Sequence, residues 1–318
     1  MKSYPIEKIR NIALVGHGGT GKSTLAEAIL FTSGAITRKG SVDDGTSASD
    51  FDQDEINRKM SINTAVLPVE WNGVKVNIID TPGYLDFVGD VIGSLRAVEA
   101  ALIVVDGGGT IEVGTESGWE FATEANVSRM FFVNKLEKEN MNFFGTLEAL
   151  RERFGNSVAP MQLPIGQESG FSGVVDLLSQ KAYKWDGGKI NPCDVPADMA
   201  DQIADRRREL IEAVAEMDDE LMMKYLDEEN LSDEEISKGL EIGMRTGKLS
   251  PVLCGSAGKL IGIETLLDFI KSSVPSPAVV DPVKGINAAG EEEIRKAGDA
   301  FSSLVFKTMA DPYVGKLT

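Results

Sequence analysis

Residues 16–23 of the chain read Gly-His-Gly-Gly-Thr-Gly-Lys-Ser, which matches the pattern G-x-x-x-x-G-K-[ST]. The apolar run Ile9–Val15 before it predicts a buried strand, and Lys22–Thr32 after it has the apolar spacing of a helix. Glycines let backbone N–H groups approach phosphate oxygens, and a helix start adds a positive dipole end. The stretch therefore predicts a phosphate-binding loop. In such a loop Lys22 reaches the β- and γ-phosphates and the Ser23 hydroxyl ligates Mg²⁺.

The composition narrows the class of protein. The chain has 318 residues, 42% hydrophobic and 26% charged, with a formal net charge of −18. Phosphate backbones are bound mainly by Lys and Arg, so a chain this acidic is a poor candidate for coating DNA or RNA. Two distant cysteines and one histidine indicate neither a disulfide framework nor a zinc cluster. No segment approaches the ~20 apolar residues of a membrane span, and Met1–Arg10 lacks a signal-peptide core, so we expect a cytoplasmic protein without membrane contact.

The remaining pattern predicts a doubly wound, mostly parallel α/β sheet. An Asn-Gly turn at 72–73 joins the expected strands Thr64–Trp71 and Val74–Asp80, and Pro68 favours a sheet edge for the first. The polar, aperiodic segment Thr37–Lys59 predicts a long mobile loop. Further strands are expected at Ala101–Asp106, Arg129–Asn134 and Val252–Cys254, and helices at Tyr84–Glu99, Gly114–Ala125, Phe143–Phe154 and Ile263–Ser273.

One section interrupts this alternation of strands and helices. Gly173–Trp185 indicates β structure, and Pro196–Leu226 predicts one amphipathic helix. The stretch from Asn191 to Arg245 holds seventeen acidic and six basic residues. We expect an inserted subdomain before the last core strand, whose acidic face is either solvated surface or a contact for a basic partner. A proline-punctuated linker follows, and Phe301–Thr318 predicts a β run that has no partner strand in the sequence.

The turn Asp80-Thr81-Pro82-Gly83 follows an expected buried strand. An Asp at such a strand end can hold Mg²⁺ through water, and the Gly83 N–H can meet the γ-phosphate. Alone the four residues would be only a turn, but their place after the phosphate loop and the hairpin favours the functional interpretation. Ser61, just before the hairpin, either supplies a hydroxyl to Mg²⁺ or is an ordinary loop serine.

Two further strand ends suit the recognition of a base. Asn134-Lys135-Leu136-Glu137 ends an expected core strand. A carboxylate there can accept from both guanine N1–H and the guanine amino group, which adenine cannot satisfy. After the last core strand, Cys254-Gly255-Ser256-Ala257 could present the Ala257 N–H to guanine O6. The alternative for each stretch is a plain strand-end turn.

With its motifs in this order, the chain resembles the translational GTPases, and within them the elongation factor G family or a divergent paralogue of it. The likeness covers nearly the whole sequence and rests on GHGGTGKST, DTPGYLDFVGDV, NKLE, GVVDLL, ELMMKYL, PVLCGSAGK and MADPYVGKLT. It implies a P-loop GTPase domain at 1–275 with an inserted α+β subdomain at about 166–250. It further implies a linker at 276–298 and, at 299–318, the first strands of a truncated β-barrel domain.

The resemblance also implies a GTP/GDP site with Mg²⁺. Water would attack the γ-phosphate in line, Lys22 and Gly83 would neutralise charge, and Tyr84 would contact the water. His17 is expected to be structural rather than a base. The implied nucleotide contacts are Gly16, His17, Gly18, Gly19, Thr20, Gly21, Lys22, Ser23, Thr24, Asp80, Gly83, Asn134, Lys135, Glu137, Ser256 and Ala257, and the implied metal ligands are Ser23, Ser61 and Asp80.

Four departures from the family pattern point to a divergent paralogue. Tyr84 stands where the family has a His that positions water; a phenol with a pKa of ~10 is no base at neutral pH, although its hydroxyl can hydrogen-bond water. Slow hydrolysis is still expected, because phosphoryl transfer depends mostly on positioning and charge neutralisation. Gly19 replaces an Asp, Glu137 replaces the shorter base-reading Asp, and the family's RGITI is here Arg58-Lys59-Met60-Ser61-Ile62.

The leading hypothesis is a monomeric, Mg²⁺-dependent GTPase that acts on the ribosome in translocation or ribosome recycling. By the resemblance, ribosomal stalk proteins would contact its inserted subdomain, and neither DNA nor a membrane would be a partner. The first alternative is a nucleotide-gated ribosome-binding factor with little or no hydrolysis, or a ribosome-protection factor. The second, a P-loop ATPase or kinase of another class, requires the NKLE and GSA stretches to be coincidences.

Overall fold

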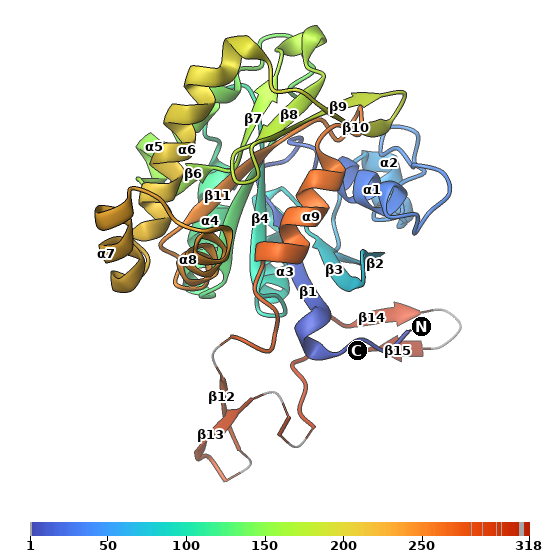
Figure 1. Cartoon of the computed structure of the whole chain (residues 1–318). Coiled ribbons are helices and arrows are strands. Elements are labelled where there is room, and N and C mark those ends of the chain that lie inside the picture. The colour runs from blue at the N-terminus through green and yellow to red at the C-terminus, as the bar shows by residue number, and fades with distance from the viewer. Residues whose placement is uncertain (1, 281, 288, 297, 300, 312–314) are drawn as a thin grey trace.

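A seven-stranded, mostly parallel sheet forms the centre of the computed structural model, which describes residues 2–280, 282–287, 289–296, 298–299, 301–311 and 315–318 (Figure 1). Its strand order is β2-β3-β1-β4-β5-β11-β6, and β2 runs antiparallel to β3 at one edge, as Pro68 predicts. The strands are β1 (Ile9–Val15), β2 (Ala65–Trp71), β3 (Val74–Asp80), β4 (Ala100–Asp106), β5 (Ser128–Asn134), β6 (Val158–Pro160) and β11 (Ser250–Cys254). This sheet confirms the predicted doubly wound α/β fold.

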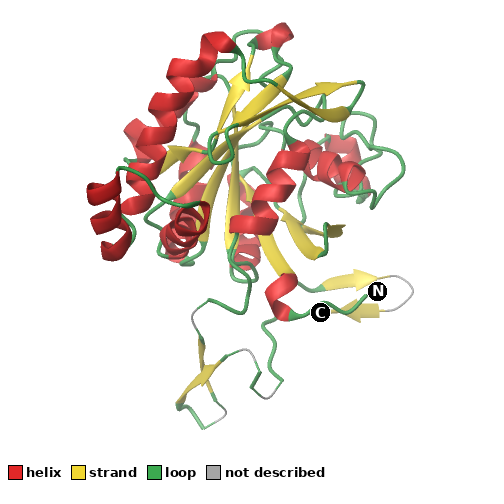
Figure 2. Cartoon of the chain, viewed as in Figure 1, coloured by secondary structure: helices red, strands yellow, loops and turns green. Residues whose placement is uncertain are grey.

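Helices cover both faces of this sheet, as Figure 2 shows. One face carries α1 (Lys22–Thr32), α8 (Asp233–Arg245) and α9 (Ile263–Ser273), and the other carries α3 (Val88–Leu95), α4 (Val113–Glu124) and α5 (Phe143–Phe154). The helix predicted over Tyr84–Glu99 is shorter, because a 3-10 turn at Leu85–Phe87 precedes α3. Between the two helical layers, the side chains of Leu14, Phe131 and Phe132 are completely buried.

The inserted section between β6 and β11 has a sheet and helices of its own. The antiparallel sheet has the order β10-β9-β8-β7, with β7 at Gln162–Ile165, β8 at Gly173–Asp176, β9 at Lys181–Asp186 and β10 at Lys189–Cys193. The prediction of one helix over Pro196–Leu226 is wrong: a 3-10 turn at Ala197–Met199 leads into α6 (Ala200–Ala215), and α7 (Asp219–Glu228) is separate. The Asp218 carboxylate accepts from the Leu221 N–H at 3.3 Å, and this cap starts a new helix.

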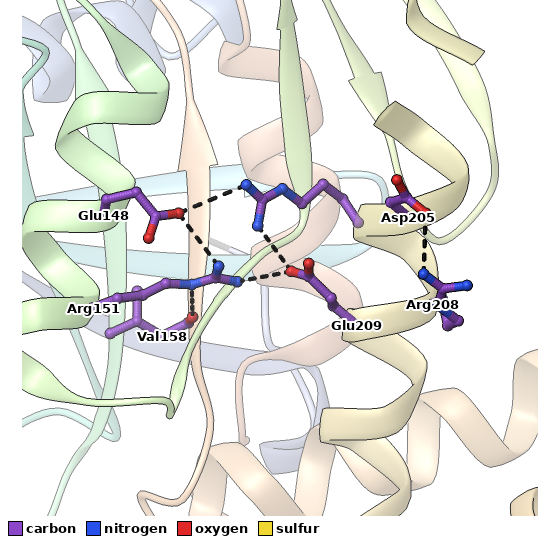
Figure 3. A network of polar contacts seen from close by, with 7 residues as sticks. Glu148, Arg151, Val158, Asp205, Arg208 and Glu209 are labelled. Atoms are coloured by element: carbon purple, nitrogen blue, oxygen red, sulfur yellow. Dashed lines mark hydrogen bonds and ion pairs between the residues drawn. The ribbon is translucent and has the colours of Figure 1, made fainter. Parts of the chain in front are cut away.

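An ion-pair network joins the insertion to α5 (Figure 3). Arg151 of α5 lies 3.3 Å from Glu209 of α6, and Arg206 of α6 lies 3.6 Å from Glu148 of α5. The Arg151 Nε atom also donates to the Val158 carbonyl at 3.2 Å. Because the pairs are partly exposed, they contribute little stability each and mainly fix how α6 lies against α5.

Segment 37–59 is more ordered than its polar sequence predicts. It contains the short helix α2 (Gln53–Arg58), which Asp52 and Glu55 start as a capping box. The buried Glu55 carboxylate also accepts from the N–H groups of Ile62 and Asn63, at 3.0 and 2.8 Å. The hydrophobic period of the sequence carries no information on such polar anchoring.

Two antiparallel strand pairs lie beyond the central sheet, towards the C-terminus. The predicted linker contains β12 (Val283–Ile286), paired with β13 (Glu292–Arg295). The expectation that Phe301–Thr318 has no partner strand is wrong, because β14 (Met309–Asp311) pairs with β15 (Gly315–Leu317). Residues 300 and 312–314 of the predicted barrel segment lie outside the described residues. Within the described part of the chain, no helix is both long and apolar enough to cross a membrane.

Candidate nucleotide-binding site

The loop between β1 and α1 has the backbone that its glycines predict. Gly16, Gly19 and Gly21 have positive φ angles of 130°, 85° and 99°, which are strained for other residues. The Nζ atom of the buried Lys22 donates to the carbonyl oxygens of Gly16 and His17, both at 2.8 Å. The loop therefore curls around an ammonium group at the start of α1, where a helix favours anions.

The charge of Lys22 depends on its surroundings. Burial lowers the pKa of this lysine to about 8, although the Asp80 and Asp50 carboxylates act in the opposite direction. An anion at the loop would favour the protonated form in the same way as these carboxylates.

The imidazole of His17 contacts the start of α4. Its Nε2 atom lies 2.7 Å from a Glu112 carboxylate oxygen, and its Nδ1 atom accepts from the Gly114 N–H at 3.3 Å. Both ring nitrogens are engaged, so the side chain links the phosphate loop to α4. This arrangement fits the structural role expected for His17.

The three predicted metal ligands lie together beside the loop. The hydroxyl oxygens of Ser23 and Ser61 are 3.0 Å apart. Both carboxylate oxygens of Asp80 are buried without a well-formed hydrogen bond. Burial raises the Asp80 pKa to about 6, and the nearby Ser23 hydroxyl lowers it only in part. Mg²⁺ prefers oxygen ligands, so an unpaired carboxylate beside two hydroxyls fits this ion.

The turn after β3 closes the other side of the site. The Thr81 hydroxyl donates to the Leu14 carbonyl at 2.7 Å and fixes this turn to β1. Gly83 packs so closely on the loop that an added Cβ would lie 2.8 Å from the Gly18 nitrogen. The turn and loop line one cavity of about 240 Å³. Its walls include the predicted residues Gly18, Gly19, Gly21, Ser23, Thr24 and Tyr84.

The predicted base-binding stretches meet at the ends of β5 and β11. The Asn134 side chain donates to the Thr20 carbonyl at 3.0 Å and accepts from the Ala257 N–H at 3.0 Å. The Lys135 ammonium donates to the Gly19 carbonyl at 2.6 Å. Asn134 thus joins the phosphate loop to the turn after β11. The Ala257 N–H, expected to contact guanine O6, is engaged by Asn134 in this structure.

Glu137 has the unsatisfied oxygen that a base reader needs. Its Oε2 atom is buried and has no hydrogen-bond partner. The turn after β11 lies beside the Glu137 carboxylate, since a Cβ added at Gly258 would be 3.3 Å from Glu137 Oε1. The Ser256 hydroxyl accepts from the Lys259 N–H at 3.0 Å and shapes the turn. An orphaned carboxylate oxygen fits the two adjacent donors of guanine.

Residues 7–276 match the family model described as elongation factor Tu GTP binding domain. The chain belongs to this family. Membership confirms the resemblance to translational GTPases of the elongation factor G type. The translational GTPase is also similar to a crystal structure of a protein from Thermus thermophilus, with a TM-score of 0.86 and 33% identity. That match covers 98% of this chain but 44% of the Thermus protein, so the chain spans less than half of that relative's length.

Two polar residues near the site of this translational GTPase were not predicted from the sequence. Asp50 is buried in the wall of the cavity, and its Oδ2 atom has no hydrogen-bond partner. Lys39 donates to the carbonyl oxygens of Ala257 and Gly258. Both lie in the aperiodic segment 37–59, and their contacts with residues far away in the sequence have no spacing rule that could have revealed them.

Proposed function

We propose that this chain is the GTP-binding and GTP-hydrolysing part of a translation factor that acts on the ribosome. The main support is the placement of three polar groups at the carboxyl ends of parallel strands in one sheet: the Lys22 ammonium after β1, the Asp80 carboxylate at the end of β3 and the Glu137 oxygen after β5. They suit a phosphate chain, a divalent cation and a guanine base respectively. In this proposal residues 1–275 form the GTPase domain, residues 276–298 a linker and residues 299–318 the first strands of a β-barrel domain.

The chemistry proposed is attack of water on the γ-phosphate of GTP. Lys22 and the Gly83 N–H would neutralise charge that develops on the phosphate oxygens, and Tyr84 would hydrogen-bond the attacking water. Bound Mg²⁺, held by Ser23, Ser61 and, through water, Asp80, would supply further positive charge. Because phosphoryl transfer depends mainly on positioning and electrostatics, a tyrosine at residue 84 is compatible with slow turnover.

The ribosome is the proposed partner, in translocation or in recycling, and the cytoplasm the proposed location. In this proposal the insertion, including α6 and α7, contacts ribosomal stalk proteins, and the factor is a monomer. The supports are the family membership of residues 7–276 and the acidic surface of the insertion.

A second candidate is a ribosome-binding factor that GTP switches without being hydrolysed at a significant rate. The observation that favours it is Tyr84, which stands where the family has a water-positioning histidine. The two candidates share the nucleotide site and differ in the measured rate of phosphate release.

The experiment that tests the shared nucleotide site is competition of GDP, GTP, ADP and ATP against a fluorescent guanine nucleotide, with and without Mg²⁺. We expect a guanine preference of at least about tenfold, which corresponds to about 1.4 kcal/mol, and tighter GTP binding with Mg²⁺. The variant Glu137→Gln should lose this preference, because the amide nitrogen offers no acceptor to the guanine amino group. Equal affinity for adenine nucleotides, or no binding, would contradict the proposal.

A further inference from the structure

Lys39 connects segment 37–59 to the base-binding turn. Its Nζ atom donates to the carbonyl oxygen of Ala257 at 2.7 Å and to that of Gly258 at 3.1 Å. The carbonyl oxygens of two consecutive residues thus accept from one ammonium group. These two hydrogen bonds fix the orientation of both carbonyl groups. The contact links a residue shortly after α1 to the loop between β11 and α9.

The ammonium group completes the support of this turn. Asn134 holds the N–H side of Ala257, whereas Lys39 holds the carbonyl side. Burial lowers the pKa of Lys39, and the Glu27 and Glu137 carboxylates oppose that effect. Lys39 therefore lies within the electrostatic reach of the carboxylate proposed to read guanine.

The backbone next to Lys39 is anchored to α1. The Gly40 N–H donates to Glu27 Oε2 at 2.7 Å, and the Ser47 hydroxyl donates to Glu27 Oε1 at 3.3 Å. The Ala48 N–H also donates to Glu27 Oε1. Residues 40–48 thus close around one buried carboxylate of the helix that begins at the phosphate loop. Movement of this part of the segment would pull Lys39 away from the turn.

We propose that Lys39 is a positioning residue that couples movement of segment 37–59 to release of the guanine base. When Lys39 holds the Ala257–Gly258 turn, the base stays enclosed. When the segment moves, the turn loses its carbonyl support and the nucleotide leaves faster. This inference rests on the proposed nucleotide-binding function.

The test is the rate of release of a fluorescent GDP after mixing with excess GDP. Lys39→Met should accelerate release about fivefold or more, and Lys39→Arg, which keeps donors for both carbonyls, should stay within about twofold of the original rate. The matched control is Arg38→Met. Arg38 is exposed, carries the same charge in the same segment, and makes no hydrogen bond or ion pair with the part of the chain that the structure describes.

A second readout separates coupling from general loosening. Amide hydrogen exchange of residues 40–48 should slow when GDP binds to the unsubstituted protein, and this response should vanish in Lys39→Met. Unchanged release in Lys39→Met, or equal acceleration in Arg38→Met, would overturn the coupling. If Lys39→Met does not fold, Lys39→Gln replaces it. Loss of the exchange response in Lys39→Gln would then support the coupling, and a retained response would overturn it. Failure of the unsubstituted protein to bind GDP would instead contradict the proposed function.

Discussion

The aromatic ring of Tyr84 lies against Gly18: a Cβ atom added at Gly18 would be 2.9 Å from the Tyr84 Cζ atom. Tyr84 is 46% exposed. It therefore stands at the rim of the cavity, where its hydroxyl can reach a water but its ring rests on the phosphate loop. The absence of a side chain at Gly18 is what allows this placement.

Tyr84→His should raise ribosome-stimulated GTP hydrolysis of the full-length protein about tenfold or more. Histidine is smaller, and with a pKa of ~6.5 it can orient or accept from water near neutral pH. Tyr84→Phe, which retains the ring and loses the hydroxyl, is the matched variant and should lower the rate. The rate of phosphate release, measured with and without ribosomes, tests both variants. An unchanged rate in Tyr84→His would show that Tyr84 does not limit hydrolysis.

Gly21→Ala should weaken GDP binding about tenfold or more. A Cβ at this residue would lie 2.6 Å from Asn134 Nδ2, so the amide that joins the phosphate loop to the base turn must move. Gly34→Ala provides the control, because Gly34, just after α1 and outside the site, also has a positive φ and nothing lies within 4 Å of its added Cβ. In both variants, backbone strain should lower the free energy of unfolding by about 1 kcal/mol. Only Gly21→Ala should lose the additional affinity in a GDP titration, and equal losses would contradict the role of Asn134.

Asp80→Asn should stabilise the fold while it impairs metal-dependent binding. The carboxylate is buried and burial raises its pKa to about 6, so its charged form costs stability near neutral pH. Removal of the charge should raise the free energy of unfolding by about 3 kcal/mol near pH 7. The gain in GTP affinity on adding Mg²⁺ should fall about tenfold. Chemical denaturation measures the change in stability, and GTP titrations with and without Mg²⁺ measure the change in affinity. A full Mg²⁺ response in Asp80→Asn would exclude Asp80 from the metal site.

Much of the candidate site follows from motifs that are local in sequence. The phosphate loop, the Asp80 turn and the Asn134 stretch each follow a strand, and parallel strands bring their carboxyl ends to one edge of the sheet. The strand order alone therefore gathers Lys22, Asp80 and Glu137.

The features that the sequence did not reveal depend on side-chain caps and tertiary contacts. The apolar spacing of Pro196–Leu226 continues through Asp218, but α6 ends at Ala215 and the Asp218 carboxylate caps the start of α7. Segment 37–59 lacks a hydrophobic period, yet the carboxylates of Glu27 and Glu55 accept hydrogen bonds from the N–H groups of Gly40 and Asp52 within it. A pattern of apolar residues cannot report either effect, because both use polar groups.

Glu99→Gln should flatten the dependence of stability on pH. Glu99 accepts from Asn11 Nδ2 at 2.9 Å, and Asn77 Nδ2 in turn donates to Asn11 Oδ1 at 2.6 Å. Burial raises the pKa of Glu99 from 4.5 to about 7, which its hydrogen bonds with Asn11 and the charge of Arg10 only partly offset. The folded protein therefore binds more protons than the unfolded chain between these values. The contribution of Glu99 to the free energy of unfolding must therefore fall as pH rises from 4.5 to about 7.

Glutamine keeps the acceptor for Asn11 and carries no charge, so near pH 8 the variant should be more stable by about 3 kcal/mol. Near pH 4.5 the two proteins should differ little, because Glu99 is mostly protonated in the fold. Urea unfolding at a series of pH values measures both effects. Glu124→Gln, on an exposed side chain of α4, is the control and should run parallel to the original protein. If the Glu99→Gln curve also runs parallel, then Glu99 ionises in the fold as readily as in the unfolded chain, and the Asn11–Asn77 network carries no pH-dependent energy.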